Sequence, residues 1–270
     1  MLGSAVIVFR EVLEAALIVT IVLAATQGVA QRNRWVAGGI GSGVLGAILV
    51  AAAAERISMA FEGAGQELFN ALVLLTAVLM LAWHNIWMSR HAQQLVSHLK
   101  HLGSDVVTGN LPLYFLATAI GVAVLREGAE VVLFMYGLAA GGSDSWSLIS
   151  GGVLGLGVGV LFGMLLYFGL LRIPTGKLFS VTGWLILLLA SGMAASAAGY
   201  LSQAGWLPSP KPLWNSSDLL SQHSLVGQLF HVMVGYQDRP TSVQLVFYLG
   251  TLLLITTGMR WSRNQAVVRT

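Results

Sequence analysis

Seven long apolar stretches, separated by short polar segments, run along the chain. Allowing several residues of latitude at each end, they cover residues 4–26, 35–54, 68–88, 112–138, 148–171, 178–199 and 243–260. Each is close to the roughly 20 apolar residues with which an α-helix crosses a hydrocarbon core of about 30 Å. The pattern therefore predicts an all-α polytopic membrane protein with seven transmembrane helices.

The composition agrees with a protein dissolved in lipid, because 56% of the residues are hydrophobic, 9% are charged and the mean hydropathy is +0.78. We expect a single integral membrane domain over residues 1–270, with an outer loop at about 200–242 before the seventh helix at 243–260. The first stretch contains Arg10, Glu11 and Glu14, where a signal peptide would have an unbroken apolar region. We therefore expect it to be retained as a helix.

The absence of cysteine excludes disulfides and thiolate ligands. Any transition metal must be held by oxygen, imidazole or thioether groups.

Basic residues are distributed unevenly between the two sets of connecting segments. Nine fall after the first, third, fifth and seventh stretches, against three in the opposite breaks. The nine are Arg32, Arg34, Arg90, Lys100, Arg172, Lys177, Arg260, Arg263 and Arg269. Since cytoplasmic segments carry the excess of Lys and Arg, we expect the N-terminus outside and the C-terminus inside.

An Arg-Glu-x-x-Glu cluster at residues 10–14 recurs 116 positions later at residues 126–130. At the same offset, glycines at 39, 41 and 43 fall on glycines at 155, 157 and 159. These matches predict a duplicated three-helix unit, at about 4–88 and 112–199, with the seventh helix as an addition. Because each unit has an odd number of spans, the copies must be inverted relative to each other, as in many secondary transporters.

Each cluster places its charged residues on one helical face. Positions i, i+1 and i+4 span about 100° of arc, so Arg10 can act together with Glu11 and Glu14. The second cluster repeats this arrangement with Arg126, Glu127 and Glu130. We expect the repeat symmetry to bring the four carboxylates together near the bilayer midplane.

An ionisable side chain at that depth costs at least about 2.5 to 3.5 kcal/mol. One interpretation is structural: each Arg pairs with the Glu four residues later and locks helices together. However, four glutamates against two arginines leave a formal charge of −2. A buried charge of that size requires protonation or a bound cation, and carboxylates suit hard ions such as Mg, Ca, Mn and iron. The residues thus predict a cation pathway without choosing the metal.

The segments Arg10-Glu11-Val12-Leu13-Glu14 and Arg126-Glu127-Gly128-Ala129-Glu130 resemble the paired Arg-Glu-Gly-x-Glu signatures of the high-affinity iron permease family. The resemblance extends over the whole chain and includes an acidic approach to the third stretch at Glu62 and Glu67. It implies that the four motif glutamates bind and pass iron. Val12 replaces the usual glycine of the first signature. That departure could narrow helix packing or alter metal access.

The resemblance also implies a setting for the protein. Iron would be the transported substrate, with no permanently bound cofactor, and the chain would be a multi-pass protein, most simply of a bacterial inner membrane. An external iron-binding protein and an oxidase or peroxidase would be its partners. No nucleic acid partner is expected.

Three further residues are candidates for an entry or relay role. Glu62 and Glu67 could receive an ion from the outer face, and the resemblance favours this over their being ordinary interfacial acids. His84 is a polar group in an apolar stretch and a reasonable metal ligand. Its position near the inner end of the 68–88 stretch favours packing or contact with lipid headgroups.

Two other functions remain open. The same glutamates could serve a permease for another cation such as Mn(II) or Pb(II), or a proton-coupled exchanger. An intramembrane metalloenzyme has little support, because the sequence contains no His-Glu-x-x-His and no Gly-x-Ser-x-Gly motif. We therefore predict a transporter and not an enzyme.

Overall fold

The computed structural model describes residues 1–60, 66–168, 175–222 and 224–267, which form eight helices. In order they are α1 (Leu2–Ala25), α2 (Arg32–Ala60), α3 (Gln66–Val107), α4 (Tyr114–Ala140), α5 (Ser145–Tyr167), α6 (Thr175–Gln203), α7 (Leu225–Val234) and α8 (Ser242–Val267). Within the described residues, the all-α prediction is confirmed.

Within the described residues, five helices are long and apolar enough to cross a membrane: Arg32–Ala54, Gln66–Trp87, Ser145–Tyr167, Gly183–Gln203 and Ser242–Trp261. They coincide with five of the seven predicted spans. The other two predicted spans are α1 and α4, which are 24 and 27 residues long. Each carries an Arg and two Glu near its middle, and these charges set it apart from the other five.

Helix α3 continues well beyond the predicted span at 68–88 and ends only at Val107. Residues 89–102 contain no Gly or Pro, so nothing in the sequence interrupts the helix. Apolar side chains at Leu99, Leu102 and Val106 recur at helical spacing and pack on α1, α2 and α4. The predicted connecting segment is therefore the second half of a helix of 42 residues.

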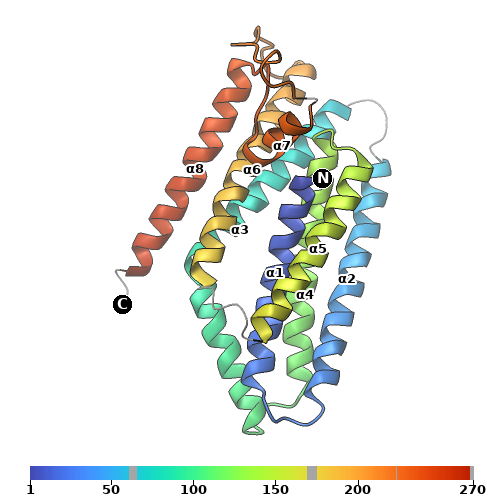
Figure 1. The fold of residues 1–270 in the computed structure, drawn as a ribbon, viewed down its shortest axis with the longest axis vertical. Helices are drawn as coiled ribbons and strands as arrows, with labels where there is room; N and C mark the ends of the chain where they lie inside the picture. Colours follow the sequence, from blue (N-terminus) through green and yellow to red (C-terminus); the bar gives the residue numbers. More distant parts are fainter. Residues whose placement is uncertain (61–65, 169–174, 223, 268–270) are drawn as a thin grey trace.

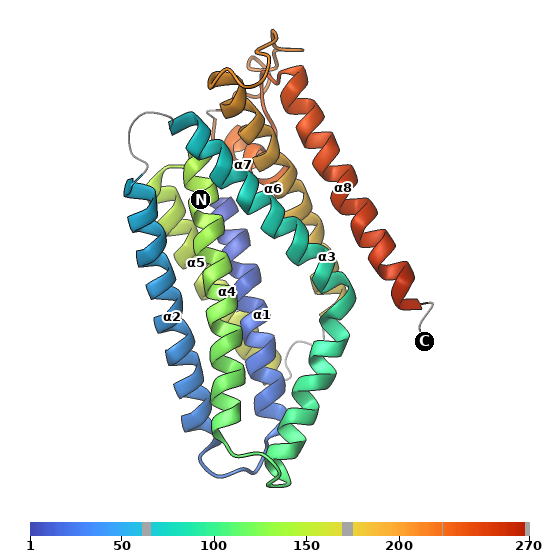
Figure 2. The same cartoon turned by 180° about the vertical axis from the view of Figure 1, so that it is seen from behind.

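Helices α1 and α4 form the centre of the bundle (Figures 1 and 2). The most extensive helix contacts are those of α1 with α5 and of α2 with α4, followed by α3 with α6. Helices α1 and α4 also pack against each other, and both contact α3. Thus the first helix of each proposed repeat lies on the second helix of the other.

Glycines make these contacts close. A Cβ atom added at Gly43 would lie 2.7 Å from the carbonyl oxygen of Gly121 on α4. One added at Gly155 would collide with the carbonyl oxygen of Ala5 on α1 and lie 2.9 Å from the amide nitrogen of Phe9. Small residues let helices approach where lipid offers no hydrophobic drive for association. The glycine runs therefore have a structural role in the α2–α4 and α1–α5 contacts.

Two apolar clusters occupy the core at different heights. One joins α1, α3, α4 and α6 and includes Ile7, Leu81 and Phe134. The other joins α1, α2, α3 and α4 and includes Ile18, Leu99 and Ile120. On each of α1, α3 and α4, the polar residues of the motifs or His84 fall between the two clusters. The polar layer is therefore enclosed by apolar side chains on both sides.

The predicted 200–242 loop contains a short helix at one end of the bundle, beside the N-terminus of the chain (Figure 1). Ser224 begins α7 by accepting a hydrogen bond from the amide of Gly227, 3.0 Å away. Gly235 ends the helix with a φ of 70°, which glycine adopts without steric cost. Gly235 also lies against Gly192, which holds α7 on α6.

We expect Gly43→Ala to lower the thermal unfolding temperature in detergent, because the new Cβ would meet the backbone of Gly121. Overpacking of this kind costs typically about 1 to 3 kcal/mol. Gly41→Ala is the matched control, since nothing lies within 4 Å of its added Cβ, and it should be neutral or slightly stabilising. Gly155→Ala and Gly157→Ala form the equivalent pair on α5. Equal melting temperatures within each pair would contradict this account.

Candidate metal-binding site in the membrane

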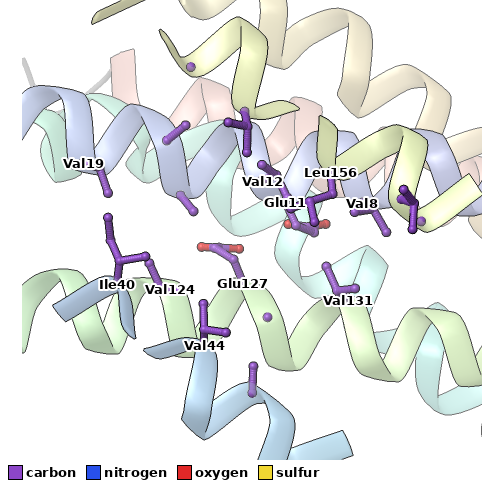
Figure 3. A pocket seen from close by; sticks show the side chains of 18 of the residues that line it. Val8, Glu11, Val12, Val19, Ile40, Val44, Val124, Glu127, Val131 and Leu156 are labelled. Atoms are coloured by element: carbon purple, nitrogen blue, oxygen red, sulfur yellow. The ribbon is translucent and has the colours of Figure 1, made fainter. Parts of the chain in front are cut away.

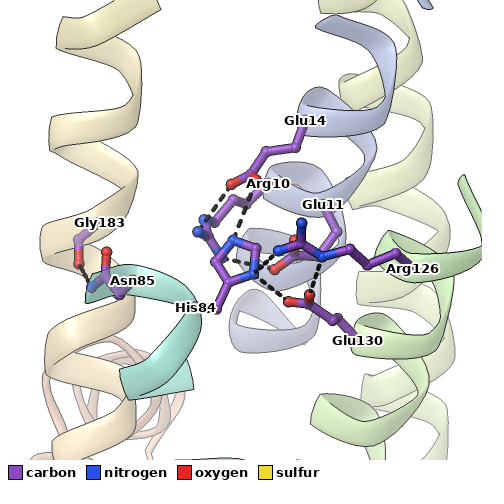
Figure 4. A network of polar contacts seen from close by, with 8 residues as sticks. All are labelled: Arg10, Glu11, Glu14, His84, Asn85, Arg126, Glu130 and Gly183. Atoms are coloured by element: carbon purple, nitrogen blue, oxygen red, sulfur yellow. Dashed lines mark hydrogen bonds and ion pairs between the residues drawn. The ribbon is translucent and has the colours of Figure 1, made fainter. Parts of the chain in front are cut away.

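Ionisable side chains from three helices meet in the middle of the bundle (Figure 4). Arg10, Glu11 and Glu14 come from α1, Glu127 and Glu130 from α4, and His84 from α3; all six are buried. Arg126 of α4 joins them with its side chain 39% exposed. The two motifs, which are far apart in the sequence, thus contribute to one cluster.

On α1, Arg10 holds both glutamates of its own motif. Its Nη1 donates to Oε1 of Glu11 at 2.9 Å, and its Nη2 lies 2.9 Å from Oε1 of Glu14. The guanidinium fork can bridge two carboxylates in this way because its donors are spread in one plane. The pairing fixes Glu11 and Glu14 relative to each other.

On α4, Arg126 pairs with a single glutamate among the described residues: its Nε donates to Oε1 of Glu130 at 3.1 Å. Its guanidinium also lies 4.9 Å from the centre of the Trp87 ring, a cation–π arrangement. Both motifs therefore form an ion pair between the Arg and the Glu four residues later, but within the described residues Arg10 alone also pairs with the Glu that follows it.

His84 lies between the two motif helices (Figure 4). Its Nδ1 lies 2.6 Å from Oε2 of Glu130 on α4, and its Nε2 lies 3.3 Å from Oε2 of Glu14 on α1. From the sequence, packing or headgroup contact is expected for His84, with a metal-ligand role as the alternative, because the residue is near the end of the predicted 68–88 span. Since α3 continues to Val107, His84 is in the interior of the bundle and 2% exposed.

Unsatisfied polar atoms concentrate in this cluster. Among the described residues, the buried side-chain nitrogen and oxygen atoms without a well-formed hydrogen bond belong to Arg10, Glu11, Glu14, His84, Glu127 and Glu130. Some still have an ion-pair contact, as Oε1 of Glu14 has with Arg10. Buried polar atoms are normally satisfied, and unpaired ones call for a bound water or ion as their explanation. The cluster has the free lone pairs that a cation would use.

Within the described residues, two sets of three possible ligands come close to the spacing of a metal site. Glu11, Glu14 and His84 form one set, and His84, Glu127 and Glu130 form the other, with the ligand atoms of each set within 4.8 Å of one another. Ligands bound to one ion at ~2.1 Å can be at most about 4.2 Å apart. Small side-chain movements are therefore sufficient to close either set around an ion.

Glu11 and Glu127 also border an apolar crevice of about 910 Å³ between α1, α2, α4 and α5. Their carboxylates extend from the two facing helices into the same space (Figure 3). Among the described lining residues, these two are the charged ones. The four motif carboxylates thus face two directions: Glu14 and Glu130 approach His84, and Glu11 and Glu127 reach the crevice.

Val12, the departure from the family signature, packs against a glycine. A Cβ added at Gly159 of α5 would lie 2.7 Å from Cγ1 of Val12. In the second motif the corresponding residue is Gly128, and a Cβ added there would lie 2.6 Å from Cβ of Ala47 on α2. The larger residue in one motif therefore faces the smaller residue on its partner helix. The valine is accommodated without separating α1 from α5.

Of the candidate entry or relay residues, His84 joins the cluster and Glu67 does not. Glu67 is exposed in the first turn of α3, 17 positions before His84, or about 25 Å along the helix. Glu62 lies outside the described residues. The structure therefore does not bring Glu67 into contact with the motif carboxylates.

The sequence matches the Iron permease FTR1 family over residues 1–264. The chain belongs to this family. No solved structure matches it.

Curated relatives of this FTR1-family chain carry the name Ferrous iron permease EfeU. One, from Escherichia coli O6:H1, is 34% identical over 244 residues, covering 87% of this chain and 86% of the relative. Another, from Yersinia pestis, is 32% identical over 272 residues and covers 97% of this chain and 95% of the relative. The similarity extends over nearly the full length of both relatives. The family resemblance seen in the motifs is confirmed.

We expect Arg10→Met to destabilise the protein more than Arg126→Met. Arg10 is 2% exposed and holds two carboxylates, so its removal leaves two buried charges unpaired. Breaking a buried ion pair by removing one partner costs about 3 to 5 kcal/mol. The side chain of Arg126 is only partly buried and is paired with Glu130 through a single nitrogen. Thermal unfolding in detergent should show the order, and an equal or reversed order would contradict the assigned pairing.

Proposed function

We propose that this chain imports iron across a membrane through the cluster of Glu11, Glu14, Glu127 and Glu130. The main support is that the four carboxylates converge in a layer enclosed by apolar side chains, and that each has a buried oxygen without a well-formed hydrogen bond. The two arginines leave a formal charge of −2 in that layer when His84 is neutral. A divalent cation offsets it. The names of the relatives favour ferrous iron as the substrate.

The two apolar clusters act as barriers on either side of the bound ion. Passage then requires that one cluster loosens while the other stays packed, so that the ion meets water on one side at a time. Rigid-body rocking of two repeats around a fixed central site produces this alternation in secondary transporters. Exchange among flexible carboxylates keeps ion binding reversible.

The transport unit we propose has seven spans, with α1 and α4 as the charged central pair and the three-helix units α1–α3 and α4–α6 inverted. This plan is supported by the packing of the first helix of each unit on the second helix of the other, α1 on α5 and α4 on α2. The helix contacts suggest equating Gly43 with Gly155, which contact Gly121 and Ala5 respectively. These two glycines are 112 residues apart, whereas the two motifs are 116 residues apart. The difference of four residues is about one helical turn. The repeats would thus differ in length by one turn between their first and second helices.

The proposed setting is a bacterial inner membrane with the N-terminus outside. An external iron-binding protein and an oxidase or peroxidase would deliver the ion, and iron would be a passing substrate instead of a resident cofactor.

Replacing Glu14 or Glu130 with Ala should abolish uptake of ⁵⁵Fe(II) into proteoliposomes, because each removal takes ligand oxygens from the central layer. Asp218→Asn is the control: this residue is an exposed acid in the segment before α7, and its variant should transport normally. Uptake at the normal rate by correctly inserted Glu14→Ala protein would refute the proposed pathway.

Permeation of another cation is the competing function. The same liposomes, supplied with Fe(II) or Fe(III) and challenged with Mn(II), Zn(II) or Pb(II), distinguish the two. We expect Fe(II) to be transported and the other ions to compete weakly. Complete inhibition by Mn(II) or Pb(II) at equal concentration would favour the general cation permease.

The orientation can be measured directly, because the chain contains no cysteine. A single cysteine at Asn110, which is exposed between α3 and α4, should be shielded from an impermeant thiol reagent in intact cells. One at Ser217, in the segment between α6 and α7, should react. The reverse labelling pattern would overturn the proposed topology.

A further inference from the structure

We propose that His84 is a direct ligand of the transported ion, shared by two overlapping three-ligand sets, and that its imidazole makes the pathway selective for transition-metal ions over Mg²⁺ and Ca²⁺. This inference rests on the proposed function and names the ligand that determines the class of substrate.

The first support is the position of the ring. His84 is the one member common to both sets, of which one otherwise consists of α1 glutamates and the other of α4 glutamates. Its Nε2 faces Glu14 and its Nδ1 faces Glu130, at 3.3 and 2.6 Å. Each half of the cluster therefore has its own imidazole nitrogen.

The second support is the way α3 is held. Asn85, the next residue, donates from Nδ2 to the carbonyl oxygen of Gly183 on α6 at 2.9 Å. Both Asn85 and His84 are buried, and Leu81, one turn earlier, is fully buried in the apolar core. A Cβ added at Gly183 would lie 3.0 Å from the amide oxygen of Asn85, so a side chain there would crowd this contact. Asn85 is thus a positioning residue that keeps the imidazole directed at the two motifs.

The chemical consequence concerns the metal. A site of carboxylates alone suits Mg, Ca and Mn ions, whereas an imidazole nitrogen shifts the preference toward Fe, Zn, Cu and Ni ions. One imidazole among carboxylates therefore disfavours the abundant hard cations. A neutral imidazole has a free lone pair on only one nitrogen at a time, so His84 binds the ion through Nε2 in one set and through Nδ1 in the other. Exchange from the α1 glutamates to the α4 glutamates then requires the nitrogen that joins the ion to give its proton to the carboxylate beside it, and the nitrogen that leaves the ion to take one up.

The test compares His84→Gln with His101→Gln, a matched control at an exposed position on the same helix. In proteoliposomes, His84→Gln should raise the apparent KM for Fe(II) at least about 10-fold, since even loss of an outer-shell partner costs 10- to 100-fold in metal affinity. Inhibition by Mg²⁺ and Ca²⁺ should become at least about 10-fold stronger relative to wild type. His101→Gln should match wild type in both measurements.

A second measurement detects whether an imidazole is bound to the iron. X-ray absorption at the iron edge of wild-type protein loaded with one Fe(II) per chain should show imidazole scattering. That signal should disappear in His84→Gln and persist in His101→Gln. Absence of imidazole scattering in the wild type would overturn the inference even if the variant failed to fold.

The two proposals fail in different ways. If Glu14→Ala and Glu130→Ala abolish uptake while folded His84→Gln keeps the wild-type KM and selectivity, the glutamate pathway stands and the role of His84 is refuted. If both glutamate variants transport normally, the pathway itself is refuted.

Discussion

The structure depends on offsetting negative charge inside an apolar bundle. Four glutamates and two arginines lie on α1 and α4, and each such side chain costs at least about 2.5 to 3.5 kcal/mol in a membrane. Arg10 stabilises two of the carboxylates directly, and Arg126 stabilises a third. The remaining negative charge is the basis of the proposed cation site. The Arg–Glu ion pairs expected from the sequence are present, but they offset only part of the negative charge of the four glutamates.

The helix arrangement follows from how these charged helices are kept from lipid. Helix α1 is covered by α5 and α4 by α2, and glycines in α5 and α2 let the backbones approach closely. Helix α3 then crosses both charged helices and brings His84 between them. The glycine contacts and the charged layer are therefore linked: without close cover, the carboxylates would be open to the surrounding lipid.

The sequence predicted the helical class and the two motifs because both depend on local patterns: apolar runs of membrane length and charges at helical spacing. It also predicted that the motif glutamates would converge. It named His84 as a candidate ligand or relay residue but did not place it between the two motifs, since one histidine in an apolar stretch carries no periodic signal. The absence of Gly and Pro from residues 89–102 was the signal that α3 would continue. Nor could a linear pattern show that Arg10 holds two glutamates whereas Arg126 stacks on Trp87.

The contact of Val12 with Gly159 shows that volume is conserved across the interface and not at each position. In the other half, Gly128 faces Ala47, so each contact pairs a glycine with a residue that has a side chain. A motif helix can thus pack closely on its partner helix with the glycine either in the motif, as at Gly128, or on the partner, as at Gly159. The two halves can therefore diverge by moving side-chain volume from one helix of a contact to the other, without displacing the motif carboxylates.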